Sequence, residues 1–144
     1  SADPVTNSRC CVRIESVHGL GEALVSGRCQ ADLHVLETAD IRHLVGAPWF
    51  GGEAGCPKYR VKTRDIKAKE LMIVPVREGE ANGVREVHLT GTKALEKKGK
   101  QPSLTKREAI HVASVCAQIA TALGLPQDIE FCIAGGGTIQ PDGS

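Results

Sequence analysis

Two carboxylates near the end of the chain stand where a buried strand is expected. The stretch PQDIEF (residues 126–131) follows a helix-like segment, precedes three glycines, and contains Asp128 and Glu130. Successive side chains of a strand point to opposite faces, so Ile129, Phe131 and Ile133 would face a core while both acids face away from it. The pattern predicts a strand over residues 128–134 with one apolar face and one face that carries chemistry.

The glycines Gly135 to Gly137 predict a turn that returns the chain as a short strand over residues 138–140. With the turn centred on Gly136, Glu130 and Gln140 share one face. An acid and an amide oxygen placed in this way suit Mg²⁺, which prefers oxygen ligands and is usually held by one or two carboxylates together with substrate phosphates. The alternative is a half-exposed hairpin whose outer face is merely polar.

A second stretch that suits phosphate chemistry is GLGE, Gly19 to Glu22. Glycines allow backbone N–H groups to approach a phosphate closely. A GxG sequence alone is more often an ordinary turn, so the phosphate loop and the turn both remain open.

The six cysteines and five histidines do not show metal-binding spacings, because no CxxC, HxH or HxxxH pair occurs. We expect the cysteines to be small buried hydrophobic residues in a reducing compartment, with Cys116 and Cys132 inside apolar runs. A disulfide-stabilised secreted domain is the alternative, and it requires most cysteines to be oxidised. Cytoplasm is the expected location, with the mitochondrion as the second choice.

Composition excludes several classes of function. The 144 residues are 41% hydrophobic and carry a net charge of +1, which favours one globular core and gives no basic surface for nucleic acid or membrane. Only 3% of residues are aromatic, so few rings are present to stack on bases. No apolar run approaches the roughly 20 residues that span a bilayer. We expect neither a nucleic-acid partner nor a membrane.

Alternation predicts the strands that must position these residues. Residues 10–17 place Val12 and Ile14 on one face, and residues 31–37 place Leu33 and Val35 on one face, opposite Asp32. A third strand is predicted over residues 70–76. Residues 45–59 predict an irregular loop because they are rich in glycine and proline, and residues 94–103 predict a charged surface linker.

One long amphipathic helix is predicted from about Thr105 to Leu123. Thr105 and Glu108 have the spacing of a capping box, and apolar residues recur at helical intervals behind them. Gly124 suits the left-handed residue after the helix, and Pro126 prevents its continuation.

Three segments taken in order resemble a known family. They are SADPVT, VRIESVHGLGEALVSGRCQAD and PSLTKREAIHVASVCAQIATALGLPQDIEF, which together cover roughly two-thirds of the chain. They resemble the nucleotide-binding domain of phosphoenolpyruvate synthase (pyruvate, water dikinase), shared by pyruvate phosphate dikinase and rifampicin phosphotransferase. The resemblance implies an ATP-grasp fold, of which residues 1–144 are a single α+β C-terminal subdomain from a longer chain, mainly antiparallel sheet with one long helix. Residues 39–100 then form a variable insertion rich in loops.

The resemblance also implies roles for individual residues. Glu130 matches the acid that binds Mg²⁺ on the ATP phosphates, and Gln140 matches a glutamine at the same metal and phosphate site. Gly19, Gly21 and Glu22 match the loop beside the nucleotide cleft. No catalytic residue is expected in this chain, whose ligands would be ATP as substrate and Mg²⁺.

The end of the chain departs from the family pattern. Asp142 stands where the family has a phosphate-binding arginine, which reverses the charge that faces the triphosphate. The expected partners are the N-terminal ATP-grasp subdomain, a phosphohistidine domain and a pyruvate-binding barrel, and none of them is encoded in these residues. We therefore expect little activity from the isolated chain. A non-catalytic binding or structural module derived from the ATP-grasp fold is the alternative.

Overall fold

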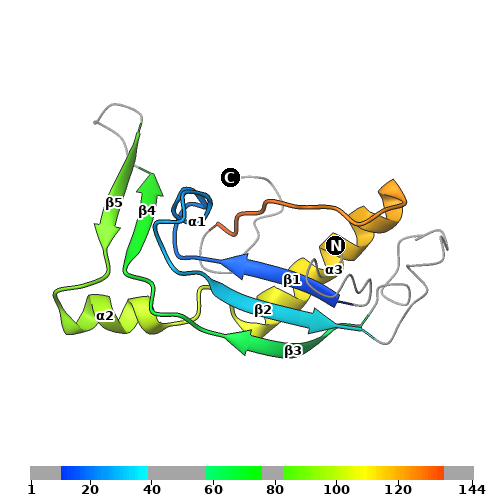
Figure 1. Cartoon of the computed structure of the whole chain (residues 1–144), viewed down its shortest axis with the longest axis horizontal. Helices are drawn as coiled ribbons and strands as arrows, with labels where there is room; N and C mark the ends of the chain where they lie inside the picture. Colours follow the sequence, from blue (N-terminus) through cyan, green and yellow to red (C-terminus); the bar gives the residue numbers. More distant parts are fainter. Residues whose placement is uncertain (1–10, 39–57, 76–82, 135–144) are drawn as a thin grey trace.

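The computed structural model describes residues 11–38, 58–75 and 83–134 (Figure 1). Its fold is α+β with antiparallel strand pairing, as the sequence predicts. The elements in chain order are β1 (Cys11–Ser16), α1 (Glu22–Val25), β2 (Asp32–Glu37), β3 (Arg60–Asp65), β4 (Leu71–Pro75), β5 (Val84–His88), α2 (Lys93–Lys100) and α3 (Lys106–Leu123).

Strands β1, β2 and β3 form an antiparallel sheet in that order. Val12 and Ile14 are buried, as alternation predicts for β1. In β2 the predicted faces are reversed, because Asp32 and His34 are fully buried while Leu33 and Val35 are only half-buried. The prediction from hydrophobic alternation therefore assigned the wrong face of β2 to the core. Asp32 can lie inside because, as described below, a buried lysine pairs with it.

Helix α3 covers the buried face of this sheet (Figure 1). The predicted capping box is formed: Glu108 N–H donates to Thr105 Oγ1 at 3.1 Å, and Thr105 N–H donates to Glu108 Oε2 at 2.7 Å. Gly124 ends the helix with a left-handed φ of 76°. The core between helix and sheet consists of small and branched side chains, including Val12, Leu36, Leu104, Ala109, Val112, Ala113 and Cys116. No helix among the described residues is long and apolar enough to cross a membrane.

A second sheet pairs β4 with β5 beside α2 (Figure 1). Strand β4 confirms the strand predicted over residues 70–76, whereas β3 and β5 were not predicted. The surface linker predicted over residues 94–103 is wrong, because most of it belongs to α2. Thr92 caps this helix by accepting a hydrogen bond from Leu95 N–H at 3.3 Å. Glycine suits position 99, near the end of α2, because the Cβ of any other residue would lie 2.4 Å from the Lys69 carbonyl oxygen.

The strand predicted over residues 128–134 is also wrong. This segment lies along the side of β1 (Figure 1), but it belongs to no strand ladder. Ile129 and Ile133 pack against the core as the alternation requires, whereas Phe131 remains 40% exposed. Alternation thus found the apolar positions but not the backbone pairing, which depends on a neighbouring strand. Two other predictions lie outside the described residues. One is the return strand at 138–140 together with Gln140 and Asp142, and the other is most of the irregular loop at 45–59. Of that loop the structure describes only the last residues, where Tyr59 is buried in the core.

Candidate functional site

A cleft of about 750 Å³ lies between the end of β1, the loop that follows it and the segment 129–133. It brings together four of the five residues that the sequence assigned to a site, which are Gly19, Gly21, Glu22 and Glu130. The fifth, Gln140, lies outside the described residues. Ser16, His18 and Ser103, which the sequence did not single out, line the same cleft.

The glycine loop is held in shape by its contact with β4. Gly19 has a positive φ of 77°, and a Cβ at this position would lie 2.2 Å from the Ile73 carbonyl oxygen. The next residue, Leu20, donates its N–H to that same carbonyl at 2.7 Å. Only glycine suits position 19, because it adopts a positive φ without strain and has no Cβ to collide with the Ile73 carbonyl. Gly21 is different, because its backbone is right-handed and open space surrounds the position of a Cβ.

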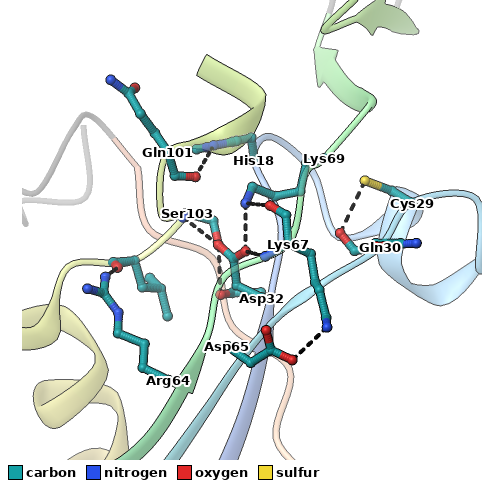
Figure 2. Close-up of polar contacts among 12 residues, drawn as sticks. His18, Cys29, Gln30, Asp32, Arg64, Asp65, Lys67, Lys69, Gln101 and Ser103 are labelled. Atoms are coloured by element: carbon teal, nitrogen blue, oxygen red, sulfur yellow. Dashed lines mark hydrogen bonds and ion pairs between the residues drawn. The ribbon is translucent and has the colours of Figure 1, made fainter. Parts of the chain in front are cut away.

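His18 joins this loop to the end of α2. Its Nε2 lies 3.1 Å from the Lys98 carbonyl oxygen and 3.2 Å from that of Gln101; Figure 2 shows the second contact. Burial lowers the pKa of His18 below its ordinary value, and the nearby charge of Lys69 lowers it further, while the two carbonyl contacts and Asp32 act in the opposite direction. The ring is therefore neutral near pH 7.

The described part of the cleft wall is acidic. It includes Glu15, Glu22 and Glu130 but no lysine or arginine among the described residues, and of these acids Glu15 is paired with Arg13 at 2.8 Å. No three His, Cys, Asp or Glu side chains gather closely enough within the described residues to form a metal site by themselves. A triphosphate in this cleft would therefore need a cation carried with it and positive groups supplied from outside these residues.

A buried ion pair lies behind the cleft (Figure 2). Lys69 Nζ donates to Asp32 Oδ1 at 2.6 Å, and both side chains have no exposed surface. Asp32 Oδ2 accepts from Ser103 N–H and from Ser103 Oγ, each at 2.7 Å, and Lys67 N–H donates to Oδ1 at 2.9 Å. Ser103 Oγ also lies 2.8 Å from Ser16 Oγ. The pair thus joins β2, the segment before β4 and the segment before α3, and reaches the cleft through its two serines.

The charge state of Asp32 follows from these contacts. Burial alone would raise its pKa, but the hydrogen bonds from Lys69, Ser103 and Lys67 outweigh burial and hold the pKa below its ordinary value. Asp32 is therefore an ionised carboxylate with a full set of donors. Sequence reasoning missed this pair because Asp32 and Lys69 are far apart in the chain. The one available signal was an acid inside an otherwise alternating strand.

His34 lies in the same buried layer, next to Arg64 across the β2–β3 pair. Neither of its ring nitrogens has a hydrogen-bond partner among the described residues, and its exposure is 0%. Burial lowers the pKa of His34, as does the Arg64 guanidinium, whereas Asp32 raises it and Lys69 lowers it. Arg64 itself donates to the Leu104 carbonyl oxygen at 2.6 Å. His34 is neutral in the folded protein.

The described cysteines form no disulfide. Cys11 and Cys116 are buried, as the sequence predicts for small apolar residues. Cys132 is exposed and lines the cleft, so its expected burial is wrong. The reason is that Cys132 alternates with Ile133, which packs against the core, so the thiol points away from it.

Comparison with known proteins assigns the chain to a family. Residues 1–140 match the family described as pyruvate phosphate dikinase, AMP/ATP-binding domain. The chain belongs to this family. It is 32% identical to a rifampicin phosphotransferase of Streptomyces sviceus over 92% of its own length and 12% of that protein. It is also similar to a probable phosphoenolpyruvate synthase of Pyrococcus abyssi, with 29% identity over 91% of this chain and 14% of the relative.

Family membership confirms the resemblance drawn from the three quoted segments. The chain spans only about an eighth of the length of these relatives, because its match covers 12–14% of each. The cleft therefore lies within an AMP/ATP-binding domain of this family.

Proposed function

We propose that this chain is the Mg·ATP-binding portion of a phosphoenolpyruvate synthase-like phosphotransferase. It would form the C-terminal subdomain of an ATP-grasp domain in a longer protein of the cytoplasm. In that protein, ATP would phosphorylate a histidine on a partner domain, and the phosphoryl group would then pass on to convert pyruvate to phosphoenolpyruvate. The observation that carries the proposal is the convergence of Gly19, Gly21, Glu22 and Glu130 on one cleft in a chain of the AMP/ATP-binding family.

The residues of the cleft suit nucleotide phosphates and Mg²⁺ in a specific way. The backbone at Gly21 leaves room for a phosphate to approach, because open space surrounds the position of a Cβ there. At Gly19 that position is occupied by the Ile73 carbonyl, so the role of Gly19 is to set the path of the loop. Glu130 is exposed and offers one carboxylate, and one or two protein carboxylates together with phosphate oxygens are the usual ligands of Mg²⁺. Bound Mg²⁺ would neutralise charge on the phosphates during phosphoryl transfer. Gln140 is proposed as a second oxygen ligand.

The acidic wall explains why we expect weak binding by the isolated chain. Glu22 and Glu130 repel a triphosphate, and no described cleft residue supplies a compensating positive charge. In the proposed parent protein, the N-terminal subdomain would supply those positive groups, while the phosphohistidine domain and the pyruvate-binding barrel would supply the acceptors. The same lack of positive charge, together with Asp142, favours the second candidate function, a non-catalytic binding or structural module.

Calorimetry with Mg·ATP tests the proposal and separates the two candidates. The wild type is compared with Glu130→Ala and with Glu96→Ala, a matched loss of an exposed glutamate on α2 outside the cleft. We expect the isolated chain to bind weakly, the N-terminal half to strengthen binding, and only Glu130→Ala to weaken it. Binding unchanged by Glu130→Ala would refute the metal-site assignment. No heat, even with the N-terminal half supplied, would leave the non-catalytic module as the function.

A further inference from the structure

We infer that His18 is a positioning residue of the cleft, whose imidazole anchors the loop Gly19 to Glu22 to the C-terminal end of α2. The identity of the ligand rests on the proposed function, whereas the anchor itself is a property of this chain. His18 lies directly before Gly19 and lines the cleft.

The hydrogen bonds of His18 determine which ring nitrogen carries the proton. Carbonyl oxygens only accept hydrogen bonds, so Nε2 must be the protonated nitrogen that donates to Lys98 and Gln101. These carbonyls lie at the end of α2, where the Lys98 oxygen also accepts from Gln101 N–H at 3.0 Å, so His18 is a second donor to Lys98. His18 therefore joins its loop to acceptors that are 80 and 83 residues away in the chain.

The loop needs an anchor of this kind because its glycines cannot supply one. Glycine gives the backbone freedom but no side chain to hold it in place. On the side of β4, the hydrogen bond from Leu20 N–H to the Ile73 carbonyl fixes the loop. On the side of α2, His18 is the fixing group. The two anchors flank Gly19 and together set the path of the backbone into the cleft.

The end of α2 is itself a firm support. Lys69 N–H donates to the Gly99 carbonyl oxygen at 3.0 Å, and a Cβ at Gly99 would meet the backbone of Lys69. Because Lys69 is bound to buried Asp32, the anchor of His18 is tied to the most buried polar contacts of the molecule. A change in His18 is therefore transmitted to the loop and not absorbed by α2.

The anchor should be insensitive to pH. Nε2 carries a hydrogen both in the neutral tautomer that these carbonyls require and in the imidazolium, so protonation leaves the two contacts in place. The charges that act on the ring are those of Lys69, which opposes protonation, and Asp32, which favours it. A direct contact between ligand and the other ring nitrogen, Nδ1, would instead change as the ring titrates.

Two amide substitutions separate the two nitrogens. The side-chain nitrogen of glutamine can occupy the place of Nε2, whereas that of asparagine is one bond shorter and reaches only the place of Nδ1. We would measure hydrogen exchange at the Leu20 amide by NMR in the full chain for the wild type, His18→Gln and His18→Asn. We would then titrate each with Mg·ATP and follow the shifts of the cleft amides at pH 6 and pH 8.

We expect His18→Gln to match the wild type. His18→Asn should speed Leu20 exchange about tenfold and weaken Mg·ATP binding about five- to tenfold, the usual effect of losing one hydrogen bond. The ratio of the His18→Asn and wild-type affinities should be the same at both pH values. The inference fails if His18→Asn behaves as the wild type, or if His18→Gln loses as much as His18→Asn. If Mg·ATP shifts no cleft amide in the wild type, the proposed function fails, and Leu20 exchange still decides whether the anchor exists.

Discussion

Replacing Asp32 by asparagine should destabilise the protein more than any comparable change of a surface acid. The substitution preserves the shape of the side chain but removes its charge, leaving the Lys69 ammonium fully buried with only neutral acceptors, among them the Lys67 carbonyl at 2.8 Å. The amide NH2 would also replace one of the two carboxylate oxygens that now accept from Lys69, Lys67 and Ser103, so that a donor would face donors. Breaking a buried pair in this way costs about 3–5 kcal/mol. A domain of this size has a free energy of unfolding of about 5–15 kcal/mol, so the loss is a large fraction of the total.

Urea denaturation followed by circular dichroism measures this loss. With a denaturant slope of about 2 kcal/mol per molar urea, the midpoint should fall by about 1.5–2.5 M. The matched control is Asp65→Asn, which removes the same charge from the exposed Lys67–Asp65 pair at 2.6 Å. Exposed pairs contribute about 0–1 kcal/mol, so its midpoint should shift by less than about 0.5 M.

The pH dependence provides a second check on Asp32. Because its hydrogen bonds hold its pKa below that of the unfolded chain, its contribution is complete above about pH 4 and is lost as the pH falls through the folded pKa. The difference between wild type and Asp32→Asn should therefore shrink in acid. Equal midpoint shifts for Asp32→Asn and Asp65→Asn at pH 7 would refute the assignment of a buried, charged pair.

Three further substitutions test other parts of the fold. Gly99→Ala should lower the urea midpoint although alanine is the better helix former, because its Cβ would collide with the Lys69 carbonyl; a gain in stability would contradict the close packing of α2. Thr105→Ala should cost about 1 kcal/mol by removing the cap of α3, and Thr105→Ser should restore most of it in the same denaturation assay. His34 has a lowered pKa, so wild-type stability should fall as the pH drops below about 6.5, the value in the unfolded chain. His34→Leu should weaken that dependence and raise the melting temperature at pH 5.5, and a steeper dependence would show that His34 is not buried as a neutral ring.

Local chemistry predicted some elements well. The capping box of Thr105 and Glu108 and the left-handed Gly124 are determined by residues within a few positions of each other, so the sequence contains all that is needed to recognise them. The same holds for the alternation of β1. The glycine loop and Glu130 were also singled out, and the structure places them in one cleft.

Features that depend on distant contacts were not predictable in this way. The segment 128–134 has the alternation of a strand, but a strand also needs a neighbour, and pairing is not visible in a single stretch. Helix α2 was interpreted as a linker because its lysines and Gly99 favour a solvated chain, whereas the fit of Gly99 against Lys69 depends on the tertiary structure. Asp32 was assigned to the outer face because its partner, Lys69, is 37 residues away. His18 had no sequence signal at all.

The contacts of Asp32 also determine how the protein opens locally. Asp32, at the start of β2, accepts hydrogen bonds from two other segments, one before β4 and one before α3, so that three segments meet at this one carboxylate. Loosening any of them alone would expose the buried pair to incomplete solvation, which is costly. The three segments should therefore open together in native-state hydrogen exchange, as one cooperative unit with a single free energy of opening. The buried pair behind the cleft, with the two serines that connect it to the cleft, is thus expected to be among the last described regions to become mobile.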